Sequence, residues 1–218
     1  MKMNDFCCSK IVRAGFVIVL VVAGVATVSA RSTSLEFSGD RTSIVLARGR
    51  ERTMLTGNAR IASDSTIVTA DEIELYGTDF RYAVASGSVT VVDTKNDLRV
   101  TAQKLFYDRE AEIMRAEGNA VMEDFANETV VKGGMIENRD EDGITIVQIG
   151  VRIFRENLTA RSEFARYRRR ENIVELSGLP VVLYRGDEYR ATRIVIDIDR
   201  DEVALQGEVR GTITTQDE

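Results

Sequence analysis

The stretch Leu55-Thr56-Gly57-Asn58-Ala59-Arg60-Ile61 carries the pattern that decides the fold of this chain. Apolar or small side chains occupy every second position, and polar side chains lie between them. This alternation predicts a β-strand with one buried and one solvated face. The pattern returns about thirty residues apart at Ala85–Val91, Ala116–Met122, Leu176–Val182 and Leu205–Gly211. A fixed period of this length indicates stacked units that bury their apolar faces only against their neighbours.

Glycines mark the repeat at intervals of 28 to 32 residues, and they are Gly57, Gly87, Gly118, Gly150, Gly178 and Gly207. Because glycine weakens a strand, its return at one register predicts a bend or a close approach of two backbones. The unit around Gly150 departs from the pattern, since Gln148 and Arg152 occupy positions that are apolar elsewhere. We interpret this unit either as a seam between two halves of the sheet or as the place where the interior opens.

A second kind of element follows each glycine strand, as in Val68-Thr69-Ala70-Asp71-Glu72-Ile73. Its next apolar residue comes three positions after the small one, which would turn a regular strand onto its other face. We therefore predict a β-bulge in these strands, beside a straight glycine strand, and the repeated bulge would curl the sheet. Short charged connections favour antiparallel hairpins, and Pro180 predicts an edge or a bulge. The expected fold is all-β: a rolled, open antiparallel sheet.

The N-terminus has the features of a secretory signal peptide. Lys2, Lys10 and Arg13 precede or enter an apolar run that ends in Val28-Ser29-Ala30. Residues 1–30 are predicted to be a signal peptide cleaved after Ala30, and residues 31–218 to be one β-domain with repeats clearest over 50–213. An uncleaved anchor is the alternative, because the run counted from Ile11 approaches the roughly 20 residues that span a bilayer. Both interpretations place the β-domain outside the cytoplasm.

The composition of the chain excludes several classes of function. Cleavage would remove both cysteines, Cys7 and Cys8, and would change the formal charge from −6 to −8. An acidic body argues against nucleic acid as the main partner. The chain contains no histidine, which is the commonest general base and metal ligand. We therefore predict no enzyme, no cofactor and no metal site.

The densest basic cluster in this acidic chain is Arg166-Tyr167-Arg168-Arg169-Arg170. Arg168, Arg169 and Arg170 are candidate contacts for a lipid headgroup or an acidic partner, since guanidinium groups pair well with phosphates and carboxylates. The alternative is a solvated turn that protects the sheet from aggregation.

The signal sequence, the acidic all-β body and the repeated units together resemble the OstA-like family. This family includes the periplasmic lipopolysaccharide-transport protein LptA, the bitopic LptC and the N-terminal domain of LptD. Residues 55–59 and Val68-Thr69-Ala70-Asp71-Glu72-Ile73-Glu74-Leu75-Tyr76 look most like the family's repeated signature. The resemblance implies an open β-jellyroll, preceded by a signal helix, whose interior holds the acyl chains of lipopolysaccharide or lipooligosaccharide.

The resemblance also implies a place and partners for the protein. It would act in the periplasm as a bridge from the inner to the outer membrane, joined by edge-strand addition to LptC-like and LptD-like jellyrolls, or to further copies of itself. Small inward residues of the repeats would leave room for lipid. The lipid-facing candidates are Leu55, Ala59, Ile61, Val89, Val91, Ala120, Met122, Val182, Tyr184, Leu205 and Val209. Two other functions stay open: an LptC-like anchored transport component, and a structural β-repeat protein without lipid cargo.

Overall fold

A computed structural model describes residues 35–63, 65–200 and 202–213, so the predicted signal segment 1–30 lies outside the described residues. The described part of the chain is all-β apart from one 3₁₀ turn, η1 (Thr78–Phe80), and it contains no helix long and apolar enough to cross a membrane. The strands are β1 (Glu36–Ser38), β2 (Arg41–Val45), β3 (Arg52–Ser63), β4 (Thr66–Tyr76), β5 (Tyr82–Asp93), β6 (Leu98–Asp108), β7 (Ile113–Asp124), β8 (Thr129–Arg139), β9 (Ile144–Arg155), β10 (Leu158–Arg168), β11 (Ile173–Ser177), β12 (Val181–Tyr184), β13 (Asp187–Arg190), β14 (Arg193–Asp197), β15 (Glu202–Gln206) and β16 (Arg210–Thr212).

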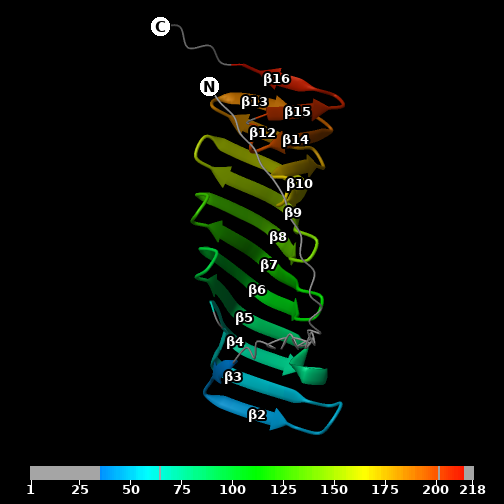
Figure 1. Cartoon of the computed structure of the whole chain (residues 1–218). Coiled ribbons are helices and arrows are strands. Elements are labelled where there is room, and N and C mark those ends of the chain that lie inside the picture. Colours follow the sequence, from blue (N-terminus) through cyan, green and yellow to red (C-terminus); the bar gives the residue numbers. More distant parts are fainter. Residues whose placement is uncertain (1–34, 64, 201, 214–218) are drawn as a thin grey trace, which may run out of the picture. The chain divides into compact units, whose positions relative to one another are not determined.

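These strands form one open sheet in which neighbours in sequence are neighbours in space. From β3 to β11 each strand pairs with the next one along the chain, and every ladder between described strands is antiparallel. Figure 1 shows this succession, from β2 at one end to β16 at the other. The predicted all-β fold, an open antiparallel sheet built from hairpins, is therefore confirmed.

Each long strand bends at an irregularity near its middle, and the position of the extra residue corrects the prediction. Between β3 and β4, Thr56 pairs with Glu72, whereas Ala59 pairs with Ala70. Two residues of β3 but only one of β4 lie between these pairs, so the extra residue belongs to the glycine strand. The repetition of the bulge is confirmed, but its predicted place in the second kind of strand is wrong. The straight glycine strand is wrong.

Paired left-handed residues explain why the glycine strand carries the bulge. Gly57 and Asn58 have φ angles of 74° and 47°. Glycine adopts this conformation without steric cost, and asparagine tolerates it better than most residues. The same pair of positive φ angles occurs at Gly87–Ser88, Gly118–Asn119, Gly178–Leu179 and Gly207–Glu208. The glycine that marks the repeat is therefore the residue that makes each corner.

The unit around Gly150 follows the same geometry with its glycine displaced by one residue. Here the left-handed pair is Ile149 and Gly150, with φ angles of 68° and 64°. Val147 and Val151 consequently flank the corner on the buried side, while Ile149 is exposed. The unit is neither a seam nor an opening. The apolar residues of this unit have the opposite parity because the glycine is displaced by one residue, and the pairing resumes after a register shift like those at the other corners.

Toward both ends of the sheet, the bend becomes a break in the strand. Strand β10 pairs with β11 along one half and with β12 along the other, and β3 pairs with β1 and β2 in the same way. Pro180 lies in the connection between β11 and β12, with its side chain fully buried. A proline cannot donate a ladder hydrogen bond, which fits its place in this gap between two strands; the prediction was an edge or a bulge.

One side of the sheet forms a continuous apolar core. Its fully buried large side chains include Leu55, Ile73, Ile136, Leu176 and Ile194. They occupy corresponding places on successive strands; Leu55, for example, pairs directly with Ile73. Alternation along each strand therefore produces rows across the sheet, and these rows supply most of the apolar burial that holds the strands together.

An ion-pair cluster ties the turn after β4 to the turn after β6. Arg81 donates two hydrogen bonds to Asp108, from Nε at 2.9 Å and from Nη2 at 2.8 Å, and it also pairs with Glu110. The backbone N–H groups of Glu110 and Ala111 donate to the same Asp108 carboxylate. The hydrogen bonds from Arg81 are the main cause that lowers the pKa of Asp108 to about 2. Two consecutive hairpins are thereby joined through one carboxylate.

This cluster predicts a specific loss of stability in acid. Because the pKa of Asp108 is lower in the folded state, its ionised carboxylate stabilises the fold at pH values above its unfolded pKa of about 4. This stabilisation is lost as the pH falls toward the folded pKa of about 2. The Asp108→Asn variant should therefore be less stable than the parent at neutral pH, and the difference should shrink between about pH 4 and about pH 2. Urea midpoints of both proteins across this range measure the effect. A difference that does not change with pH would contradict it.

Candidate functional site

An apolar cavity of about 890 Å³ lies against the buried side of the sheet, between β3 and β7. Most of its apolar lining comes from both halves of the bent strands: Ile61, Val68, Val91 and Val100 on one side of the corner, and Ile73, Leu75, Ala83, Ala85, Leu105 and Met114 on the other. A bend in every strand therefore turns one face of a sheet into two facing walls. The cavity volume is within the usual range for small-molecule sites.

Small side chains contribute to the space between the walls. Ala83 and Ala85 stand on β5 at inward positions where a leucine or phenylalanine would project into the cavity. Close packing normally leaves few voids larger than a water molecule in a protein interior. A cavity of this size with a largely apolar lining is thus suited to an apolar ligand.

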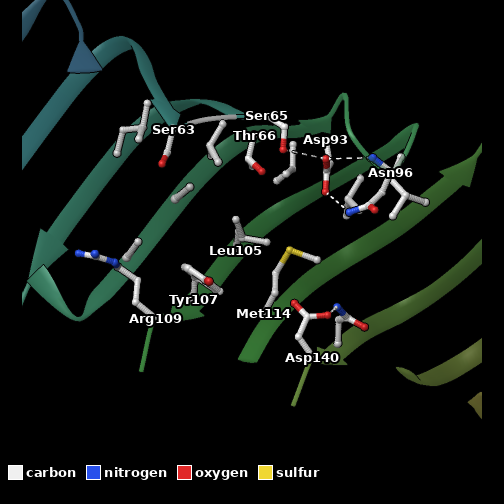
Figure 2. Close-up of a pocket in the computed structure, with 18 of the residues that line it drawn as sticks. Ser63, Ser65, Thr66, Asp93, Asn96, Leu105, Tyr107, Arg109, Met114 and Asp140 are labelled. Carbon is white, nitrogen blue, oxygen red and sulfur yellow. Dashed lines mark hydrogen bonds between the residues drawn. The ribbon is translucent and has the colours of Figure 1, made fainter. Parts of the chain in front are cut away.

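One margin of the cavity is formed by turns that are held by aspartate and asparagine. Figure 2 shows Asp93 accepting hydrogen bonds from Ser65 at 3.3 Å and from the Asn96 side chain at 2.6 Å. Partial burial opposes ionisation of Asp93, but these bonds and those from the Lys95 and Asn96 N–H groups hold its pKa below the ordinary value. Asp124 and Asn127 form a corresponding pair one hairpin further along. The carboxylates of this margin therefore stabilise turns.

The opposite margin combines phenols with arginines that are already engaged. Burial, and then the charge of Asp140, raises the pKa of the Tyr107 hydroxyl above its ordinary value. Arg109 donates to the backbone carbonyls of Asp79 and Phe80, and Arg169 pairs with Asp140 at 2.9 Å. Tyr107, Arg109, Met114 and Asp140 lie near one another in Figure 2. The arginines at this margin support loops as well as facing the cavity.

Of the eleven residues predicted to face lipid, Ile61 and Val91 line the cavity. Five others are fully buried in the core, and these are Leu55, Ala59, Val89, Ala120 and Val182. Three are partly buried and pack against the core, and these are Met122, Tyr184 and Leu205. Val209 is 53% exposed in the connection before β16. Two of the eleven predicted positions, on β3 and β5, therefore border the cavity.

The missed lining residues come mainly from the second kind of strand. Val68, Ile73, Leu105 and Met114 face the cavity but were not among the predicted positions. For Val68, Ile73 and Leu105 a signal was present, because the apolar-Thr-Ala pattern marks their inward positions as clearly as the glycine pattern does. Alternation along a strand does not distinguish the inward residues that border empty space from those that fill it.

The three candidate arginines form ion pairs and hydrogen bonds at the end of β10 and in the turn that follows it. Arg168 pairs with Glu171 and Glu175, Arg169 pairs with Asp140, and Arg170 donates to the backbone carbonyl of Glu141 at 2.6 Å. These contacts favour a structural role in joining adjacent hairpins. Among them, only Arg169 also lines the cavity.

No cluster of three or more metal-ligating side chains occurs within the described residues. The site offers apolar walls, hydroxyl groups and engaged charges.

Residues 43–144 match the family described as LptA/(LptD N-terminal domain) LPS transport protein, and these residues include most of the apolar lining of the cavity. Among solved structures, the crystal structure of LptH, the LptA homologous periplasmic component of the conserved lipopolysaccharide transport device from Pseudomonas aeruginosa, is similar over 84% of this chain and 96% of that chain. The identity is 10% and the TM-score 0.27, values too low to carry an argument. No curated protein matches the chain in sequence. The resemblance of the repeated strands to the OstA-like family is therefore confirmed by the family model over residues 43–144.

Proposed function

We propose that this protein binds the acyl chains of lipopolysaccharide or a related glycolipid in the cavity between β3 and β7, and shields them on the way from the inner to the outer membrane. The observation that carries the proposal is the apolar cavity inside a domain of a transport family. Its walls are aliphatic and its margins polar, which suits an amphipathic ligand whose headgroup stays near water.

The energetics of lipid transfer explain why such a cavity is needed. Exposing one acyl chain of about 12 methylenes to water costs on the order of 10 kcal/mol at about 0.8 kcal/mol per methylene. A lipid with several chains therefore cannot cross an aqueous gap unshielded. A bent sheet with an apolar inner side supplies that shield.

The ends of the sheet support a bridge made of several proteins in the periplasm. Among the described strands, β2 pairs only with β3, and β16 pairs only with β13. Each strand therefore has an unpaired edge to which a further strand can add. Ile44 on β2 and Ile213 just after β16 are exposed apolar residues at these ends. LptC-like and LptD-like jellyrolls, or further copies of this chain, are the partners we propose.

Two alternatives make different predictions. An LptC-like anchored component would keep Met1, whereas an exported and cleaved protein would begin near Arg31; the mass of the protein isolated from cells distinguishes them. A purely structural repeat protein would carry no lipid. Mass spectrometry of the protein purified without detergent exchange tests that alternative, and the cavity favours finding lipid.

Photo-crosslinking at neighbouring residues tests the binding site directly. A crosslinking side chain at Val68 or Val91, which line the cavity, should capture lipid in cells. The same group at Thr69 or Val92, the next residue on each strand, should capture several-fold less, because successive side chains of a strand point to opposite faces. Equal capture at the inward and outward positions would contradict the proposed site.

A further inference from the structure

Five cations form a row across the outer face of the sheet. Cross-strand pairing places Lys132 opposite Arg152, and Arg152 opposite Arg161. The row continues through Val181 to Arg190, and from Arg190 to Arg210. The side chains point outward, since all five cations are exposed while chain neighbours such as Val131, Val151 and Ala160 are buried. We call this set, Lys132, Arg152, Arg161, Arg190 and Arg210, the basic row.

The basic row is largely without counter-ions. Arg190 pairs with Glu188, but no described carboxylate lies within 4.0 Å of the charged nitrogens of the other four. Like charges placed directly opposite each other destabilise a sheet. The same row on β4 to β7 carries no charge at all, since it consists of Thr69, Thr90, Thr101 and Val121. Arg60 on β3 extends the same row beyond β4, so all of the row's cations but one lie on β8 to β16, in a chain whose net charge is −6.

Exposed apolar side chains lie in the adjacent row of the same face. Val130 pairs with Phe154, Phe154 with Thr159, and Thr159 with Leu183. Phe154 is 38% and Leu183 45% exposed. The Lys132 ammonium lies 5.8 Å from the centre of the Phe154 ring, so the two rows are in contact. Cations beside exposed aromatic and aliphatic groups form an amphipathic outer surface.

We propose that this surface binds an anionic membrane through the headgroups of acidic phospholipids. With neighbouring strands about 4.8 Å apart, the basic row spans roughly 24 Å, enough for several headgroups at once. Lysine and arginine attract an anionic bilayer surface, and aromatic or aliphatic side chains enter its interface. An acidic protein would satisfy the charges but would not explain why Phe154 and Leu183 stay exposed beside them. The inference concerns the outer face, so it does not depend on the lipid cavity of the inner side.

Vesicle binding of charge-neutralised variants tests the inference. The protein, with the N-terminus it has after export, should bind phosphatidylcholine vesicles that contain phosphatidylglycerol and should bind pure phosphatidylcholine vesicles much more weakly. The triple variant Arg152→Gln/Arg161→Gln/Arg210→Gln should bind the anionic vesicles on the order of 100-fold more weakly at low salt. It should remain folded, because the substitutions relieve repulsion between like charges.

A matched variant separates the row from net charge. Arg48→Gln/Arg50→Gln/Lys95→Gln removes three exposed cations elsewhere and should leave vesicle binding nearly unchanged. Equal weakening in both triple variants, or equal binding of the parent to anionic and neutral vesicles, would overturn the proposal. Unchanged vesicle binding together with loss of an acidic protein from the purified complex would assign the row to a protein partner and would also overturn it. Lipid crosslinking at Val68 is measured in the same variants. The vesicle assay tests the basic row and the crosslinking tests the cavity, so failure of one proposal is distinguishable from failure of the other.

Discussion

Replacing Gly87 with alanine is expected to lower the free energy of unfolding by about 3 kcal/mol. Two costs add here. Gly87 has a φ angle of 76°, and the left-handed conformation costs an L-residue about 1–2 kcal/mol. A Cβ atom would also lie 2.2 Å from Oδ2 and 2.9 Å from Cβ of Asp71 on the preceding strand. Overpacking of this kind typically costs about 1–3 kcal/mol. Urea unfolding of the two proteins measures the difference.

Two further variants divide this loss into its causes. Gly150 has a similar φ angle of 64°, but no atom lies within 4 Å of the position its Cβ would take. The Gly150→Ala variant should therefore show the conformational cost alone, about 1–2 kcal/mol. Adding Asp71→Gly to Gly87→Ala should restore the part that is due to the clash. Equal losses at Gly87 and Gly150 would show that contact with Asp71 plays no part.

The contact at Gly87 is one member of a series that explains the repeat. At five corners a side chain from an earlier strand or connection occupies the space beside the glycine: Asp40 at Gly57, Asp71 at Gly87, Gln103 at Gly118, Glu163 at Gly178 and Thr192 at Gly207. At the displaced unit the relation is reversed, since Ile149 lies against Gly134. Close approach and backbone conformation therefore both require glycine. These two requirements explain why the glycine recurs in each unit while the other residues of the repeat differ.

The fold was predictable because period-two alternation fixes which side of a strand is buried. Leu55, Ala59 and Ile61 were assigned to one side from sequence, and all three are buried together. The bulge was assigned to the wrong strand because the irregular spacing is visible at Ala70 and Ile73, whereas the extra residue lies opposite them. A glycine followed by asparagine or serine was the overlooked signal, since both positions accept a left-handed backbone.

The site was predictable only in part, because empty space depends on how two walls face each other. Inward position alone does not distinguish Val89, which is fully buried in the core, from Val91 two residues later, which borders the cavity. Both satisfy the same alternation. The basic row was hidden for a related reason. Its members are 9 to 29 residues apart in sequence, and only the register of successive ladders brings them together.

Replacing Leu176 with alanine is expected to cost about 3 kcal/mol and to change how the sheet unfolds. Leu176 is completely buried on β11, between Ala165 of β10 and Ile194 of β14. Truncating a buried leucine typically costs about 2–5 kcal/mol, because apolar contacts are lost and a cavity remains.

The position of Leu176 adds a second consequence. In a stack where each strand contacts only its neighbours, stability is close to a sum of local terms, so a local loss can separate one part of the stack from the rest. Strands β11 to β16 should therefore unfold at a lower urea concentration than β3 to β10, and the single transition should broaden or divide. Leu179→Ala is the matched control, since Leu179 is 87% exposed three residues along the chain and should cost little. Hydrogen exchange that rises uniformly over the whole sheet in Leu176→Ala would contradict local unfolding, because the loss would then be shared by every strand.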